Sequence, residues 1–190
     1  MTRSMWASRG RRRLRGGLAT AGIAAVLLTA MPATSASASS HAIPGSVMIE
    51  SGAFHGYVLC ASPNDESVWL KPINTSNPYC SWLELSQGPS GNFTLYNLAK
   101  GQVMAYTGGN EGAVVMEGSG TSPLGANGEL WSWGGGEDWG ANALQSFSDS
   151  GQNVDAKSPD GDSPRTDAVH TRGWRHGYQR ELTWNAITAG

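Results

Sequence analysis

The sequence has 190 residues, of which 39% are hydrophobic, with 13 Lys+Arg and 15 Asp+Glu. Six of the basic residues and none of the acidic ones lie in the first 38 positions, so residues 39–190 carry 7 basic and 15 acidic residues, a net charge of −8. An acidic surface repels phosphate groups, which argues against partners such as nucleic acid or an anionic membrane.

The first 38 residues have the layout of a secretory signal peptide. Six arginines between Arg3 and Arg15 precede an apolar run at 18–30 and a tail of small residues at 36–38. The run is too short to span a bilayer, and no later stretch approaches the roughly 20 apolar residues that a membrane helix needs. We therefore expect cleavage after Ala38 and a secreted protein, typical of bacteria, whose export route (general or twin-arginine) stays open.

The remaining chain predicts a short segment, 39–46, followed by one all-β domain at 47–188. Gly, Pro, Ser, Asn and Asp interrupt this part every 8 to 12 residues, so no helical period is sustained. Short runs rich in Val, Trp, Tyr, Phe and Leu lie between the breaks, at 47–49, 57–59, 68–70, 93–96, 114–116 and 130–133. Such runs are typical of a β-sandwich or a β-barrel.

The two cysteines, Cys60 and Cys80, both follow the predicted cleavage site. In an oxidising compartment they favour one disulfide, which closes a loop of about 20 residues and contributes about 3 kcal/mol in the chain-entropy model. A catalytic thiol is the alternative.

Three sets of residues recur in the same order and favour a barrel with an internal threefold repeat. Each set has a glycine that opens a pentapeptide with an apolar fourth residue, then a valine, then a closing tryptophan: Gly56, Val68, Trp82; Gly101, Val114, Trp131; Gly151, Val169, Trp184. We expect three units of four short strands, unit one at about 47–90, unit two at 91–140 and unit three at 141–188. The tryptophans would fill a shared core, where each indole N–H needs an acceptor. The alternative is coincidence in a glycine-rich chain.

These residues resemble the ricin-type β-trefoil lectin family over roughly 47–188. That family repeats Gly-x-x-Leu-Asp and closes each unit with Gln-x-Trp. Here the three tryptophans are present, whereas the glutamine positions hold Cys80, Glu129 and Leu182. The resemblance implies an all-β, β-trefoil fold of three pseudo-equivalent units and a carbohydrate-binding function.

The resemblance also implies which units keep a sugar site. In the family the aspartate accepts hydrogen bonds from sugar hydroxyls, and an aromatic ring stacks on the pyranose. The aspartate position reads Cys60, Ala105 and Asp155 in the three units. Because Cys60 and Cys80 occupy two positions that meet in a trefoil, unit one would hold a disulfide in place of a sugar site, and the pocket of unit two would be vestigial.

Unit three is therefore the predicted carbohydrate site. Asp155 would accept hydroxyl hydrogen bonds, Trp174 would stack on the sugar, and His176 or Tyr178 would add a contact. In the alternative interpretation Trp174 caps the barrel, and the arginines of this segment balance the acidic residues Asp160, Asp162 and Asp167.

No catalytic, phosphate-binding or dinucleotide motif occurs, so we expect neither an enzyme nor a cofactor. A metal site at His170 and His176 is the weaker alternative to an ordinary exposed pair, and we expect no metal. The predicted function is weak glycan binding, with a dissociation constant on the order of millimolar to high micromolar. The alternative is a trefoil that binds a protein partner, such as an inhibitor or a surface-interaction factor.

Overall fold

The computed structural model describes residues 44–135 and 142–189. The predicted signal peptide, 1–38, and residues 39–43 of the predicted N-terminal segment lie outside the described residues. Among those described, no helix has the length and apolar character needed to cross a membrane.

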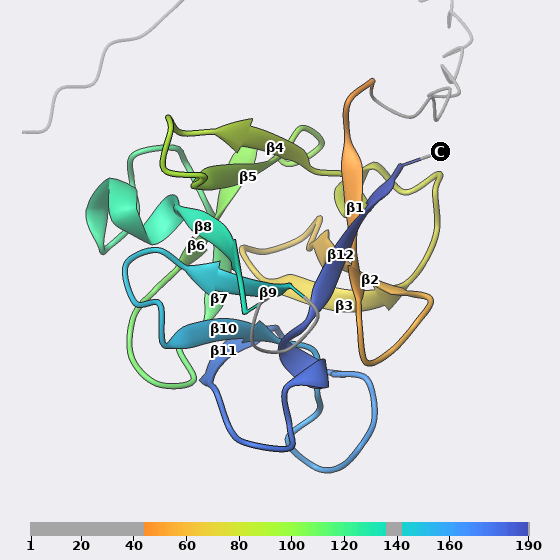
Figure 1. Cartoon of the computed structure of the whole chain (residues 1–190). Helices are drawn as coiled ribbons and strands as arrows, with labels where there is room; N and C mark the ends of the chain where they lie inside the picture. The colour runs from red at the N-terminus through yellow and green to blue at the C-terminus, as the bar shows by residue number, and fades with distance from the viewer. Residues whose placement is uncertain (1–43, 136–141, 190) are drawn as a thin grey trace, which may run out of the picture. The chain divides into compact units, whose positions relative to one another are not determined.

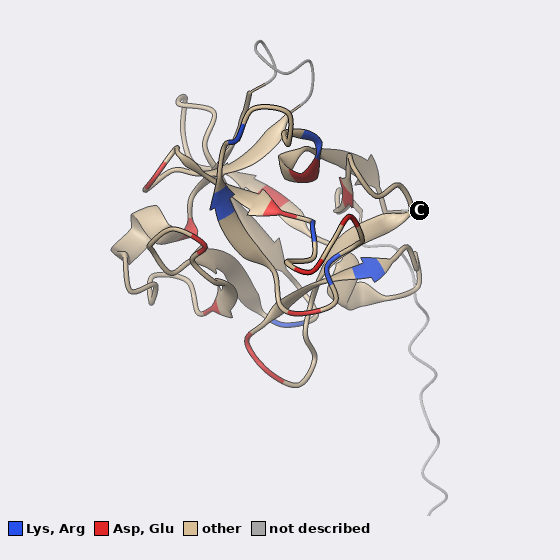
Figure 2. Cartoon of the chain, turned by 90° about the horizontal axis from the view of Figure 1, so that it is seen from below, with Lys and Arg blue, Asp and Glu red and all other residues tan. Residues whose placement is uncertain are grey.

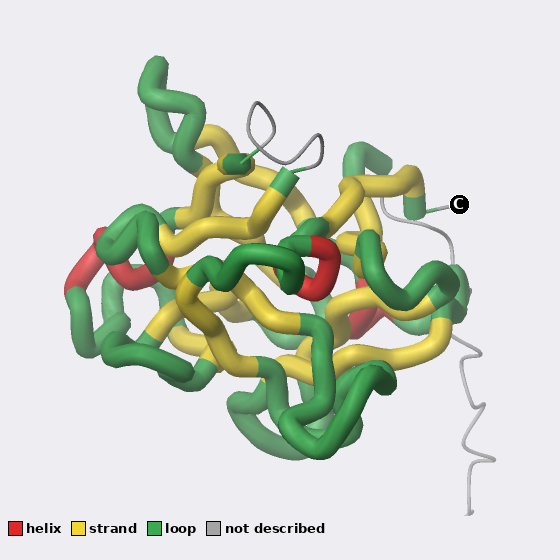
Figure 3. The backbone as a smooth tube through the Cα atoms, turned by 60° about the horizontal axis from the view of Figure 1, so that its bottom comes forward, coloured by secondary structure: helices red, strands yellow, loops and turns green. Residues whose placement is uncertain are grey.

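Twelve strands and three short 3-10 helices make up the described part, and Figure 3 shows the helical turns as brief interruptions between strands. The strands are β1 (Val47–Ser51), β2 (Tyr57–Ala61), β3 (Val68–Pro72), β4 (Leu83–Ser86), β5 (Phe93–Asn97), β6 (Gln102–Tyr106), β7 (Val114–Glu117), β8 (Trp131–Gly134), β9 (Ala143–Ser146), β10 (Gln152–Asp155), β11 (His170–Gly173) and β12 (Trp184–Thr188). The 3-10 helices are η1 (Pro78–Cys80), η2 (Gly125–Glu129) and η3 (Arg180–Leu182).

Six of the strands close a barrel. β1 pairs with β12, β4 with β5, β8 with β9 and β5 with β8, all antiparallel. Figure 1 shows the first and last strands, β1 and β12, running side by side. The two remaining seams are narrow: Val47 and Trp82 exchange two backbone hydrogen bonds of 2.8 Å between β1 and the start of β4, and Ala143 bridges Thr183 between β9 and β12. Closure leaves no free edge in the barrel.

The other six strands form three hairpins, β2–β3, β6–β7 and β10–β11, which meet one another in a ring. The three predicted valines lie at this junction and are almost fully buried. The Val114 N–H donates to the Val169 carbonyl at 3.1 Å, and the Val169 N–H donates to the Val68 carbonyl at 2.7 Å. The hairpins therefore hold the three units together.

The closing tryptophans show the repeat most directly. Trp82, Trp131 and Trp184 are each 0% exposed. Their Nε1 atoms donate to the carbonyls of Leu59 at 2.9 Å, Met104 at 2.9 Å and Val154 at 3.0 Å, which are the apolar fourth residues of the three pentapeptides. The predicted threefold unit, its shared core and the β-trefoil fold are confirmed.

The glycines that open the first two pentapeptides have a conformational reason. Gly56 and Gly101 have φ of 83° and 72°, a left-handed conformation in which a side chain is strained. Each lies directly before the strand that carries the tryptophan's acceptor. These turns therefore set the start of β2 and β6.

The predicted disulfide is formed. Cys60 in β2 and Cys80 at the end of η1 are bonded, with a Cα–Cα distance of 4.0 Å. Both residues are buried in a small cluster beside Met48, Val58 and Ala189. The bond thus fastens the turn before Trp82 to the strand that accepts its indole hydrogen bond.

Candidate functional site

The three units differ at one equivalent place, the last residue of the 3-10 helix before each closing tryptophan. This residue is Cys80 in unit one, Glu129 in unit two and Leu182 in unit three, and all three are buried. In each unit the N–H of the next residue donates to the carbonyl three residues before it: Ser81 to Pro78, Leu130 to Asn127 and Thr183 to Arg180. The backbone therefore repeats while the side-chain chemistry does not.

In unit two the Glu129 carboxylate is used by the neighbouring loop. Its Oε1 accepts the N–H groups of Gly120 at 2.6 Å and Ser122 at 3.4 Å. Ala105, at the position of the family's aspartate, is fully buried and offers no polar group. Unit two therefore has no acid at the position of the family's aspartate, and the vestigial state of its pocket stays a prediction.

Glu117, on β7 in the same unit, lies where its charged form is disfavoured. The stability of the protein should therefore depend on pH at this residue. Burial, and then the charges of Glu129 and Glu66, raise the pKa of Glu117 above its ordinary 4.5, and its Oε2 lacks a hydrogen-bond partner within the described chain. A raised pKa in the folded state favours stability below pH 4.5, and this contribution is lost as the pH rises through the raised value. Glu117→Gln should therefore raise the melting temperature at pH 7.

Thermal melts of Glu117→Gln and wild type between pH 3.5 and 8 check this expectation. The difference should shrink toward acid pH, where the wild-type side chain is already protonated. Glu84→Gln is the matched control, because Glu84 is exposed on β4 and its charge does not contribute to the raised pKa of Glu117. A Glu117→Gln advantage that is the same at every pH would show that charge is not its cause.

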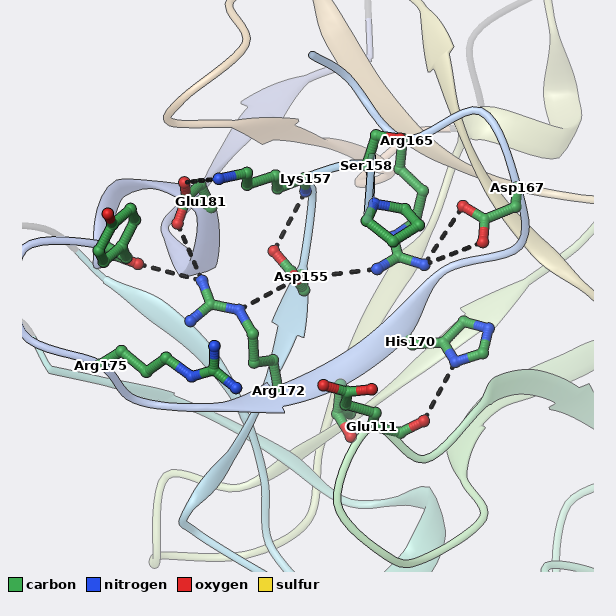
Figure 4. Close-up of a pocket in the computed structure, with 13 residues that line it drawn as sticks. Glu111, Asp155, Lys157, Ser158, Arg165, Asp167, His170, Arg172, Arg175 and Glu181 are labelled. Atoms are coloured by element: carbon green, nitrogen blue, oxygen red, sulfur yellow. Dashed lines mark hydrogen bonds and ion pairs between the residues drawn. The ribbon is translucent and has the colours of Figure 1, made fainter. Parts of the chain in front are cut away.

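Unit three contains a pocket of about 590 Å³. Polar and charged residues dominate its wall, and Figure 4 shows them converging from β10, β11, the loop between them and η3. The lining residues are Glu111, Asp155, Lys157, Ser158, Pro159, Arg165, Asp167, His170, Thr171, Arg172, Arg175, Tyr178 and Glu181. Glu111 is the member contributed by unit two.

Asp155 lies at the centre of this pocket and is only 5% exposed. Its Oδ2 accepts from Arg172 Nε at 3.1 Å and lies 3.7 Å from an Arg165 guanidinium nitrogen, while Oδ1 accepts the Lys157 N–H at 3.1 Å. Two guanidinium groups thus neutralise the carboxylate. Asp155 therefore holds the two arginines in place and has less capacity left for sugar hydroxyls.

A second acid completes the network. Glu181 accepts from Arg172 at 2.9 Å and lies 3.5 Å from Lys157 Nζ, which also pairs with Asp162 at 2.7 Å. The hydrogen bond between Lys157 and Asp162 raises the pKa of Lys157 and lowers the pKa of Asp162. The Lys157 and Asp162 side chains are therefore both charged at neutral pH.

The predicted site residues separate into two pairs. Asp155 and Tyr178 line the pocket, and Tyr178 is 54% exposed at its rim. Trp174 and His176 do not line it, although their rings pack edge to face at 6.0 Å on the adjoining loop, where Trp174 is 48% exposed. Their assignment as sugar contacts stays a prediction.

The predicted site does not include Lys157, Arg165, Arg172 or Glu181. A signal for three of them was present, because four of the seven basic residues after position 38 fall between 157 and 175. Glu111 offered no such signal, since it lies 44 positions before Asp155. Figure 2 shows acidic positions lying among the basic ones, so the net charge of the chain was a poor guide to this cluster.

Comparison of the sequence with protein-family models and with curated proteins gives no match. Solved structures do match. A designed threefold-symmetric protein, ThreeFoil, has a TM-score of 0.60 and 15% identity over 75% of this chain and 98% of its own. A lectin of Polyporus squamosus, bound to a human-type influenza-binding epitope, has a TM-score of 0.55 and 18% identity over 75% of this chain and 48% of its own.

A mosquitocidal holotoxin has a TM-score of 0.62 and 13% identity over 75% of this chain. The chain spans only 16% of the holotoxin's length and about half of the Polyporus lectin's. At these identities the likeness establishes the fold and nothing finer. The resemblance to ricin-type lectins is thus confirmed at the level of the architecture, and the protein has the β-trefoil fold of lectins and toxin domains.

Proposed function

We propose that the protein is secreted and binds a glycan, without catalysis, through the pocket of unit three. The β-trefoil lectin fold supports carbohydrate binding in general. The observation that carries the proposal is the polar pocket itself, which lies in the unit that retains Asp155. Secretion rests on the signal-like pattern of residues 1–38.

The wall of this pocket suits a sugar because it offers both hydrogen-bonding groups and a ring. Carboxylates accept hydrogen bonds from sugar hydroxyl groups, and guanidinium groups donate hydrogen bonds to ring and hydroxyl oxygens. Tyr178 supplies an aromatic face at the rim, over which the Lys157 ammonium lies 5.3 Å from the ring centroid. Asp155 would act on the ligand mainly by holding Arg172 and Arg165, which makes it a positioning residue.

Tyr178→Ala should weaken glycan binding about tenfold, which corresponds to about 1.4 kcal/mol, because it removes the ring at the rim. A glycan array selects the ligand, and calorimetry on the wild type and the variant measures the loss. Phe147→Ala is the matched control, since Phe147 is an exposed aromatic residue outside the pocket. Equal affinities for the two variants would remove Tyr178 from the site, and an array without any bound glycan would remove the proposal.

A protein partner is the second candidate function. Two large aromatic side chains, Trp174 and Tyr178, are about half exposed on one loop, and exposed aromatic residues are enriched where proteins bind one another. Trp174→Ala tests this candidate. It should abolish capture of a protein from culture medium if the loop is the interface, while leaving the pocket wall unchanged.

A further inference from the structure

Basic residues are concentrated around one pocket of an otherwise acidic protein. Residues 39–190 carry a net charge of −8 and only seven Lys+Arg, yet four of the seven line the pocket of unit three. They are Lys157, Arg165, Arg172 and Arg175. Such clustering gives the pocket a local chemistry different from that of the surrounding surface.

Three of these cations are matched by acids. Lys157 pairs with Asp162 and Glu181, Arg172 with Asp155 and Glu181, and Arg165 with Asp155 and Asp167. Arg175 is an exposed member of the lining, and no dashed line joins its guanidinium group to another residue drawn in Figure 4. The lining holds four acidic and four basic residues, so it has no excess positive charge, but Arg175 is the lining cation that forms no ion pair among the described residues.

Arg165 adds a second unmet donor. Its side chain is only 9% exposed, and its Nε has no hydrogen-bond partner among the described residues. Ion pairs to Asp155 and Asp167 hold the group in position. A buried guanidinium with an unused N–H is incompletely satisfied, and an acceptor brought by a ligand would complete it.

The remaining acid of the wall, Glu111, is held apart from Arg175. Its backbone has a φ of 58°, the only positive value among the described residues other than glycine, and its carbonyl oxygen lies 3.1 Å from His170 Nδ1. In Figure 4 Glu111 lies beside His170, away from Arg175. A carboxylate there suits the hydroxyl groups of a ligand, whereas the arginine suits an anion.

We propose that this pocket binds an acidic glycan, with the carboxylate or sulfate group of the sugar held by Arg175. The inference rests on the proposed glycan binding and specifies its ligand class. A guanidinium group matches a carboxylate or sulfate by two parallel N–H···O hydrogen bonds, which gives geometric selectivity as well as attraction. The hydroxyls of the same sugar would face Glu111, and its ring would lie against Tyr178.

The test uses an array that presents neutral glycans beside their carboxylated and sulfated analogues, followed by calorimetry on the best matched set. Wild type is compared with Arg175→Gln and with Arg180→Gln, whose arginine is exposed on η3 but does not line the pocket. Circular dichroism and a thermal melt establish that both variants are folded. We expect the acidic analogue to bind at least about tenfold more tightly than the neutral one, and less tightly as salt is added.

Arg175→Gln should remove that preference and leave the affinity for the neutral analogue unchanged, while Arg180→Gln should retain the preference. Equal binding of neutral and acidic glycans to wild type would overturn the inference and leave glycan binding standing. A preference that survives in Arg175→Gln would overturn the assignment of the acidic group to Arg175. Binding of no glycan, neutral or acidic, would overturn the proposed function and the inference together.

Discussion

Trp131→Ala is expected to lower the free energy of unfolding by about 3–5 kcal/mol, the range for deleting a buried tryptophan side chain. The indole is fully buried, and its Nε1 donates to the Met104 carbonyl at 2.9 Å. The substitution leaves a cavity in the shared core and a carbonyl without its donor, and each adds to the loss. Urea unfolding followed by circular dichroism measures the change.

Two further variants separate the causes. Trp133→Ala is the matched control on the same strand, because Trp133 is only partly buried and packs against Phe93 at 5.4 Å, so its loss should be clearly smaller. Trp131→Phe fills most of the cavity but cannot donate a hydrogen bond, so it should retain much of the stability. Equal losses at 131 and 133 would contradict the role of Trp131 as a core residue.

The same loss, within about 1 kcal/mol, is expected for Trp82→Ala and Trp184→Ala, because the three indoles share one environment. Close agreement would show that the three tryptophans contribute equally to the free energy of unfolding as well as sharing one geometry.

The second large effect concerns the disulfide. The double variant Cys60→Ala/Cys80→Ala should be about 3 kcal/mol less stable than the oxidised protein, because the bond closes a loop of about 20 residues and restricts the unfolded chain. Both sulfurs are buried among apolar side chains, so alanine leaves no unpaired polar group. The midpoint of urea unfolding, with and without a reducing agent, measures the contribution.

Reduction supplies the control for this prediction. Reduced wild type should unfold close to the double variant, and the double variant should not respond to the reducing agent. Glycan binding should persist in the folded variant, since the bond lies in unit one and the proposed pocket in unit three. Identical stability of oxidised and reduced wild type would contradict a stabilising role for the bond.

Not every strand could be predicted from residue type. β9 was absent from the predicted runs, because Ala143–Ser146 has no β-branched or aromatic residue to favour an extended chain. It is a strand because β8 and β10 pair with it on either side. Tertiary pairing therefore decided its structure.

The sequence alone determined the architecture, because the residues that define it recur in a fixed order and act within each unit. In each unit a glycine precedes a strand, and the fourth residue of the pentapeptide presents its backbone carbonyl to the core. The indole N–H of the closing tryptophan donates to that carbonyl. With only Cys60 and Cys80 present, the disulfide also followed from the sequence.

Only the tertiary structure decided the composition of the pocket. Glu111 lines the pocket from another unit, and Trp174 lies outside its wall. Arg172 and Arg165 form ion pairs with Asp155. The physical reason is that contacts between segments distant in sequence place the side chains of loops. Buried charged groups are placed in addition by the ion pairs that they must form. Neither follows a local period, so a motif can mark the unit that holds a site without naming the groups that face the ligand.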